Sequence, residues 1–167
     1  KHLLAKDESM SRVLVFVNNK KIVDMVHDKI EAEFPGQFGV IHSNKSQNYR
    51  LMTMAEFQEG NLRGIITTDV MARGLDISNI THVINFETPE FAELYMHRIG
   101  RTGRADASGT AYTFYTPREE EAILDAQVLM DMEIVPETFP EDVEISTVLI
   151  GPEKDRQQVK FLTKKPK

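Results

Sequence analysis

Short apolar runs rich in β-branched residues alternate with longer amphipathic stretches along most of this chain. The runs predict strands at residues 13–17, 38–41, 64–67, 81–86 and 109–115. Between the first two strands, Ile22, Val26 and Ile30 fall on one face of a helix. Strands that alternate with helices pair in parallel through right-handed crossovers. The pattern therefore predicts an α/β fold, a three-layer α/β/α domain with a mostly parallel central sheet.

Three further helices are expected from signals at their ends. Ser46 is expected to cap a helix that stops at Gly60. Pro89 is expected to open the next helix, and Thr116 with Pro117 supplies a cap and a first-turn proline for the last one.

Residues that directly follow the predicted strands are the first candidates for a site. In open α/β sheets, ligands bind outside the carboxyl ends of the strands. The candidates on this rule are Asn18, Asn19, His42, Ser43, Thr68, Asp69 and the loop after Phe86.

The regular pattern fades after Pro136, where prolines and charged residues become frequent. We expect a domain at residues 1–140 and a C-terminal extension at 141–167 that is partly flexible. The chain begins with Lys1 rather than Met, so we expect it to be a piece of a longer product.

Composition narrows the class of protein. The 167 residues are 28% charged and 41% hydrophobic, which is ordinary for a globular domain. The absence of Cys excludes a disulfide scaffold and any metal site with Cys ligands. No stretch approaches the roughly 20 apolar residues that cross a bilayer, and residues 1–10 lack the apolar core of a signal peptide. We expect a cytoplasmic protein with no membrane partner.

The net charge of −6 argues at first against a nucleic-acid partner, because neutralising phosphates requires Lys and Arg on one surface. The charges are segregated along the chain, however. Residues 131–144 hold six acids and no base, whereas residues 153–167 hold six bases and two acids. The net charge therefore does not exclude a basic surface.

The strongest local feature is YMHRIGRTGR at residues 95–104, where Arg98, Arg101 and Arg104 recur every three residues. Gly100 and Gly103 disfavour a continuous helix, so we expect a helix end that runs into a tight loop. Guanidinium groups bind phosphate oxygens in pairs and keep their charge, which suits them to hold a polyphosphate and its transition state. The alternative is a solvated basic loop that pairs with nearby acids.

A second feature, TTDVMARGLD at residues 67–76, places a hydroxyl pair at a strand end before Arg73, Gly74 and Asp76. Glycine lets backbone approach closely, and the group could hold a phosphate backbone and a ribose hydroxyl. Taken alone, a structural turn in which Asp76 caps a local group explains the feature as well.

With two further motifs, these features resemble the C-terminal RecA-like domain of the DEAD-box RNA helicases, in helicase superfamily two. YMHRIGRTGR is similar to motif VI of that family, and TTDVMARGLD is similar to motifs V and Va. VLVFVNN at residues 13–19 is similar to motif IV, and Gln47 with Arg50 is similar to the QxxR of motif IVa. The motifs occur in the family's order over residues 10–117. We expect a RecA-like fold and a bacterial source.

The resemblance implies roles for individual residues. Arg101 and Arg104 would be catalytic through the γ-phosphate of ATP, with Arg101 as the arginine finger. The ATP-binding residues would be Gly74, Asp76, Arg101 and Arg104. The RNA-binding residues would be Asn19, Ser43, Gln47, Arg50, Thr68 and Arg73. The interdomain residues would be His97, Arg98 and Phe16, the last supporting motif VI from beneath. No residue is expected to bind a metal.

None of the nine glycines is followed by Lys, so the sequence has no Walker A loop, and it has no DEAD sequence. We therefore expect ATP with Mg²⁺ to bind the complete protein, the magnesium being held mainly by an N-terminal RecA-like domain in cis. RNA would be bound through its backbone with little sequence preference. The protein would be a monomeric RNA helicase that unwinds or remodels RNA locally, and this fragment alone would be inactive.

Two other functions stay open on the sequence. One is a non-catalytic RNA-binding or scaffold module of the same fold, and the other is a DNA translocase of the same superfamily. The basic residues 153–167 are either a tether for RNA or a solvated tail.

Overall fold

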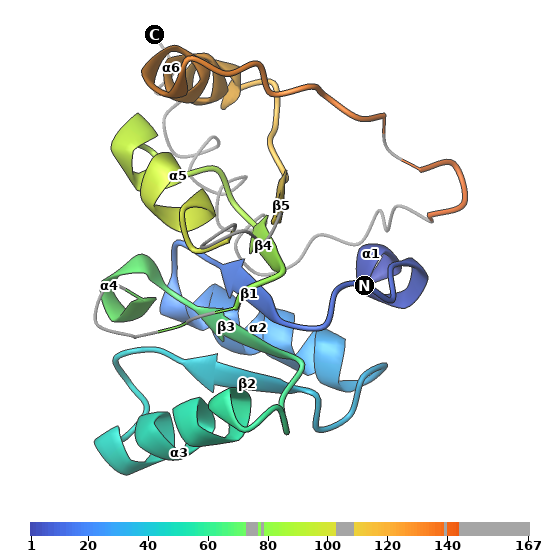
Figure 1. Ribbon diagram of the computed structural model, residues 1–167, viewed down its shortest axis with the longest axis vertical. Coiled ribbons are helices and arrows are strands. Elements are labelled where there is room, and N and C mark those ends of the chain that lie inside the picture. Colours follow the sequence, from blue (N-terminus) through green and yellow to red (C-terminus); the bar gives the residue numbers. More distant parts are fainter. Residues whose placement is uncertain (73–76, 78, 103–108, 139, 144–167) are drawn as a thin grey trace, which may run out of the picture. The chain divides into compact units, whose positions relative to one another are not determined.

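The computed structural model describes residues 1–72, 77, 79–102, 109–138 and 140–143. In this part of the chain, strands form one sheet in the order β2-β3-β1-β4-β5, and every neighbouring pair is parallel (Figure 1). The strands are β1 (Val13–Phe16), β2 (Phe38–Ile41), β3 (Gly64–Thr67), β4 (His82–Asn85) and β5 (Thr110–Thr113). The sheet confirms the predicted α/β fold.

Helices pack on both faces of this sheet (Figure 1). The helices are α1 (His2–Lys6), α2 (Lys20–Glu31), α3 (Gln47–Gln58), α4 (Asp69–Ala72), α5 (Ala92–Ile99) and α6 (Glu120–Met130). One core cluster joins α1 and α2 to alternate strand residues such as Val13 and Val15. The other joins α3 and α4 to the intervening residues, such as Leu14 and Phe16. The alternation along β1 therefore separates the two helical layers.

Helices α5 and α6 pack against each other through a smaller cluster formed by Tyr95, Ile123 and Ala126. On α2, the predicted apolar face is confirmed, since Ile22, Val26 and Ile30 are all buried in the core.

The strands end level with one another. Phe16 at the end of β1 pairs with Thr67 of β3 and with Asn85 of β4, and Ile41 at the end of β2 also pairs with Thr67. Because the strands are parallel, the residues that follow them reach the same edge of the sheet. We call this edge, where β1 to β4 end, the carboxyl edge.

The helix starts follow the predicted signals only in part. Ser46 caps α3, since its hydroxyl accepts a hydrogen bond from the N–H of Tyr49 at 3.2 Å. The prediction that Thr116 caps the last helix and Pro117 lies in its first turn is wrong, because α6 begins at Glu120 with Glu119 as its N-cap. The carboxylate of Glu119 accepts hydrogen bonds from both the N–H and the hydroxyl of Thr116, which closes a turn before α6 begins. Helix α5 likewise begins after Pro89 rather than at it.

The chain divides into two compact units, Lys1–Val135 and Pro136–Lys167. All the elements named above lie in the first unit, and the sequence placed the boundary at residue 140. Residues 153–167, predicted to be a tether or a tail, lie outside the described residues. Within the described part, no helix is both long enough and apolar enough to span a membrane.

Candidate functional site

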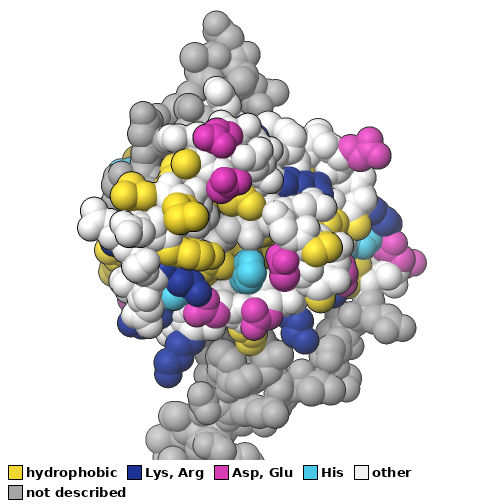
Figure 2. Space-filling view, turned by 90° about the horizontal axis from the view of Figure 1, so that it is seen from below, with side chains coloured by type: hydrophobic (Ala, Val, Ile, Leu, Met, Phe, Trp, Pro, Cys, Tyr) yellow, Lys and Arg dark blue, Asp and Glu magenta, His cyan; other side chains and the backbone are white. Residues whose placement is uncertain are grey.

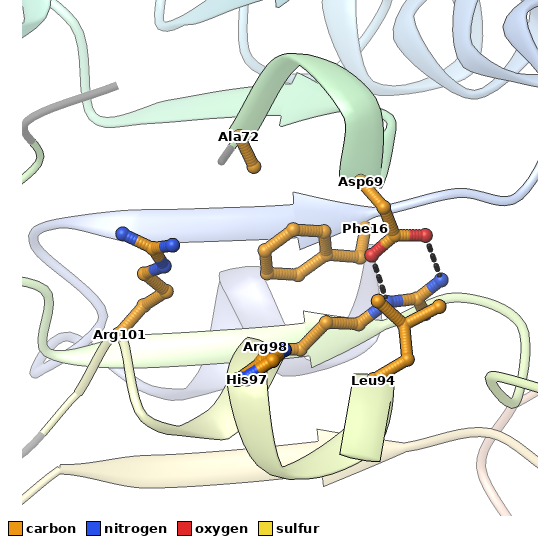
Figure 3. Close-up of a pocket in the computed structure, with 7 residues that line it drawn as sticks. All are labelled: Phe16, Asp69, Ala72, Leu94, His97, Arg98 and Arg101. Carbon is orange, nitrogen blue, oxygen red and sulfur yellow. Dashed lines mark hydrogen bonds and ion pairs between the residues drawn. The ribbon is translucent and has the colours of Figure 1, made fainter. Parts of the chain in front are cut away.

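A buried guanidinium group lies at the centre of the carboxyl edge. Arg98, near the end of α5, is 1% exposed. Its Nε and Nη2 donate hydrogen bonds to the two carboxylate oxygens of Asp69, each at 2.7 Å (Figure 3). Asp69 is the first residue of α4 and lies two positions after β3, so this bidentate ion pair fastens α5 to the end of that strand.

The other donors of Arg98 reach the ends of the neighbouring strands. Nη2 also donates to Oδ1 of Asn18, just after β1, at 2.6 Å. Nη1 donates to the carbonyl oxygen of Glu87 at 3.0 Å and to Oδ1 of Asn85 at 3.4 Å, at the end of β4. All five N–H donors of the guanidinium therefore have an acceptor, and a buried charge is tolerated on this condition. One side chain holds the ends of three strands.

Arg101 follows one turn later and points elsewhere. Its backbone N–H donates to the carbonyl oxygen of Arg98 at 3.2 Å, so the main chain continues directly from the anchored turn. Its guanidinium lies apart from Asp69 and makes no hydrogen bond with another residue of the pocket that it helps to line (Figure 3). The pocket residues are Phe16, Asp69, Ala72, Leu94, His97, Arg98 and Arg101.

Three residues of this pocket carry a predicted interdomain role. The centroid of the Phe16 ring lies 5.1 Å from Cζ of Arg98. Every donor of Arg98 is used within the first unit, whereas His97 is exposed. His97 is thus the member of this trio best placed to reach a second domain, and a contact of any of the three with such a domain stays a prediction.

Two of the predicted RNA-binding residues follow the central strands at the carboxyl edge. Asn19 is the N-cap of α2, where its side-chain oxygen accepts a hydrogen bond from the N–H of Lys21 at 2.9 Å. Thr68 follows β3 and is half-buried, and its carbonyl oxygen accepts hydrogen bonds from the first turn of α4.

The remaining described members lie after β2. Ser43 is exposed in the loop between β2 and α3, and Gln47 is the exposed first residue of α3. Arg50 lies one turn further, with Nη1 at 3.5 Å from Sδ of Met71 in α4. Its Nε is buried and has no hydrogen-bond partner among the described residues. A buried donor without an acceptor is costly, so Arg50 is a candidate to bind an oxygen supplied from elsewhere.

A second charged cluster joins α2 to the loop after β2. The carboxylate of Asp24 lies 3.1 Å from Nε2 of His42 and 2.9 Å from Nζ of Lys45. Burial alone would raise the pKa of Asp24, but the hydrogen bonds from Lys45 and His42 outweigh it and hold the pKa below its usual value. The carboxylate is therefore charged at neutral pH.

Four of the predicted site residues lie outside the described residues, namely Arg73, Gly74, Asp76 and Arg104. Their contacts with ATP or RNA stay predictions. In the described part of the chain, no group of His, Cys, Asp or Glu side chains is arranged to hold a metal ion. The expectation that magnesium is held mainly by another domain also stays a prediction.

Sequence reasoning missed the partners of Arg98. The rule on strand ends selects Asn18 and Asp69 but gives neither a role. The available signal was a carboxylate directly after a buried strand, since an ionised acid at such a position requires a cation or several donors. Only the fold shows that the cation is Arg98, because the pair is separated by 29 residues.

Comparison with known proteins agrees with this geometry. Residues 1–106 match the family described as the helicase conserved C-terminal domain. The chain therefore belongs to this family, in the form that DEAD-box RNA helicases carry. The predicted resemblance to that family is confirmed, whereas the relatives include both eukaryotes and bacteria and leave the bacterial source a prediction.

Two curated relatives illustrate the likeness. The ATP-dependent RNA helicase p62 of Drosophila melanogaster is 39% identical over 132 residues, which cover 77% of this chain and 18% of the relative. The DEAD-box ATP-dependent RNA helicase CshA of Geobacillus kaustophilus is 47% identical over 106 residues, which cover 64% of this chain and 22% of the relative. The chain thus spans about a fifth of the length of each of these relatives.

Solved structures share the fold. The E. coli DEAD-box protein SrmB, in its complex with regulator of ribonuclease activity A, has a TM-score of 0.73 at 28% identity, and the match covers 86% of both chains. The C-terminal domain of the DEAD-box protein Dbp5 has a TM-score of 0.66 at 28% identity, with 74% of this chain and 72% of that chain covered. The all-parallel sheet is therefore that of DEAD-box RecA-like C-terminal domains.

Proposed function

We propose that this chain is the C-terminal half of an ATP-dependent RNA helicase. It would bind the RNA backbone and supply an arginine finger to an ATP site shared with an N-terminal RecA-like domain. The observation that carries the proposal is the contrast between two arginines of one helix end. The N–H donors of Arg98 are used within its own domain, whereas the side chain of Arg101 points away from that hydrogen-bond network.

The contrast supports an arginine finger because such a group must be fixed in position and still have donors available. Arg98 anchors the turn to three strands, and the N–H of Arg101 continues from that turn. A guanidinium carried on a backbone fixed in this way can stabilise the charge that develops on a γ-phosphate. Arg104 would act beside it. The ATP and its Mg²⁺ would be held mainly by the other domain, and the fragment alone would not turn over ATP.

The RNA assignment is supported by where the polar groups lie. Thr68, Ser43 and Gln47 all follow strands that end at the carboxyl edge. Hydroxyl, amide and guanidinium groups bind phosphate and sugar, so little sequence preference is expected. On the face seen in Figure 2, acidic and basic side chains are interspersed rather than gathered by sign. Figure 2 looks at the molecule from the side of β2 and α3 and not onto the carboxyl edge, so the RNA assignment rests on the individually placed groups.

A comparison of RNA with DNA as activators of ATP turnover tests the proposal. ATP turnover by the protein that includes the N-terminal RecA-like domain should rise with single-stranded RNA and not with DNA of the same length and sequence. Equal stimulation by both nucleic acids would support the DNA translocase instead. RNA binding without any turnover would support the non-catalytic module.

A further inference from the structure

The loop between β2 and α3, residues 42–46, is tied to α2 by side-chain hydrogen bonds and an ion pair. His42, the first residue of the loop, is buried and 2% exposed. Its Nε2 lies 3.1 Å from the carboxylate of Asp24, which also binds Nζ of Lys45 at 2.9 Å. From the same helix, Nζ of Lys20 donates to Oδ1 of Asn44 at 2.9 Å. The loop is therefore held from outside by α2.

His42 also forms hydrogen bonds with the backbone of the loop, and so links the loop to Asp24. Its Nδ1 accepts a hydrogen bond from the N–H of Asn44 at 3.3 Å, and its carbonyl oxygen accepts one from the N–H of Lys45 at 3.0 Å. When Nδ1 accepts, Nε2 carries the proton and donates to Asp24. The carboxylate thus fixes the ring orientation in which both backbone hydrogen bonds form.

We propose that Asp24 is a positioning residue for RNA binding, acting through His42 and Lys45 to hold loop 42–46 in its RNA-binding shape. The inference rests on the proposed function, in which Ser43 and Gln47 contact RNA. Ser43 lies inside the loop, and Gln47 directly follows it. Ordering this loop before RNA arrives removes an entropy cost from the binding step.

The sign of the effect separates positioning from simple electrostatics. Asp24 is 49% exposed at its side chain and negatively charged, so its field repels a phosphate backbone. Removing the charge without any structural consequence would strengthen RNA binding. Positioning predicts the opposite result, namely that loss of the carboxylate weakens binding because the loop becomes less ordered.

Asp28 provides a matched control. It lies one turn further along α2, with its side chain 83% exposed, and its carboxylate lies 3.9 Å from Nδ1 of His27 on the same helix. Asp24→Ala and Asp28→Ala remove the same charge from the same helix. Asp24→Glu keeps the carboxylate and serves as the conservative variant.

The affinity of the 167-residue chain for a short fluorescein-labelled oligouridylate is measured by anisotropy, at a temperature where urea unfolding shows every variant to be folded. Asp24→Ala should bind about fivefold or more weakly, because a charge-assisted tie on the loop is lost. Asp28→Ala should bind within about twofold of the wild type or more tightly. Asp24→Glu should retain most of the affinity.

Hydrogen exchange of the Asn44 and Lys45 amides is the second readout, since it reports loop order without RNA. Both amides should exchange faster in Asp24→Ala and at the wild-type rate in Asp28→Ala. If wild type binds RNA while Asp24→Ala binds equally well or better, the positioning role is overturned. If wild type itself does not bind RNA, the proposed RNA function of this edge fails first, and the inference falls with it.

Discussion

Arg98 and Arg101 are the same residue type three positions apart, and their surroundings give them different tasks. The guanidinium of Arg98 has five acceptors and is 1% exposed, which makes it part of the interior. Breaking a buried ion pair by removing one partner leaves an uncompensated charge and costs about 3–5 kcal/mol. Substitution of Arg101 should lower ATP turnover but leave the free energy of unfolding nearly unchanged.

We predict that Arg98→Lys lowers the free energy of unfolding by about 2–4 kcal/mol, because an ammonium cannot form the bidentate pair with Asp69 or reach both neighbouring strands. Urea unfolding of the chain measures this change. Arg101→Lys is the matched control and should stay within about 0.5 kcal/mol of the wild type. Equal stability of the two variants would contradict the anchoring role of Arg98.

His82, the first residue of β4, makes folding sensitive to pH at the edge opposite the site. Burial lowers the pKa of His82, and Arg63 acts in the same direction, while Asp7 at 3.6 Å opposes them. The unfolded chain, where a histidine has a pKa of about 6.5, therefore takes up a proton before the folded chain does. This contribution to stability is present above that pKa and is lost as the pH falls through the lower folded pKa.

The predicted consequence is that the urea midpoint of the wild type falls as the pH is lowered from about 7.5 to about 5.5. His82→Gln should show a smaller fall over the same interval, because it removes the titrating group. Unfolding curves at several pH values for the two proteins give this comparison. The same fall in both would mean that another group is responsible.

At the residue scale, the family resemblance gave Arg98 an interdomain role and Arg101 a catalytic one, but the sequence did not show the contacts that hold Arg98. Motif spacing placed Arg98 and Arg101 in one group of phosphate-binding arginines. Nothing in the spacing shows that Asn18, Asp69 and Glu87 converge on the first of them, because each follows a different strand. The direction of a side chain near a helix end depends on where those strands finish.

At the scale of elements, the loop and the first turn of α3 carry much of the candidate RNA face. Ser46 ends the loop and caps the helix through the N–H of Tyr49. A capping hydroxyl satisfies a donor that would otherwise have no partner within the helix. The cap therefore fixes where Gln47 and Arg50 begin.

Ser46→Ala should lower the free energy of unfolding by about 1 kcal/mol, the usual effect of removing an N-cap hydroxyl. Ser43→Ala, in the same loop and exposed, is the control and should change stability by less than about 0.5 kcal/mol. Thermal and urea unfolding of both variants measure the difference. A loss for Ser43→Ala as large as that for Ser46→Ala would show that the loop and not the cap is responsible.

The elements themselves were largely predictable. Buried parallel strands appear as short continuous apolar runs, so the predicted strands at residues 38–41 and 64–67 coincide with β2 and β3. The start of α6 was not predictable from Thr116 and Pro117. A hydrogen bond from the Thr116 hydroxyl to Glu119 closes a separate turn there. A Thr-Pro pair in the sequence does not show whether it caps the helix or forms a turn before it.

At the scale of the whole molecule, the parallel topology explains why residues from distant segments share one edge. Asn18, Ser43 and Asp69 belong to three separate segments, and all follow strands that end at the same level. The edge offers donors for phosphates, but its described residues provide no metal site, and the sequence contains no Walker A loop. These observations fit half of a shared ATP site, in which each ligand would bridge two domains and favour the closed state.

The measurement that tests this account most directly is ATP turnover, with and without RNA, by the chain alone and by the chain joined to its N-terminal RecA-like domain. The N-terminal domain is the one proposed above, and we predict turnover only in the joined protein and only with RNA. Arg101→Ala should lower that turnover by about 10³-fold or more, as for an arginine finger, while ATP and RNA still bind. Turnover by the chain alone, or a loss of less than about tenfold in Arg101→Ala, would contradict the shared site.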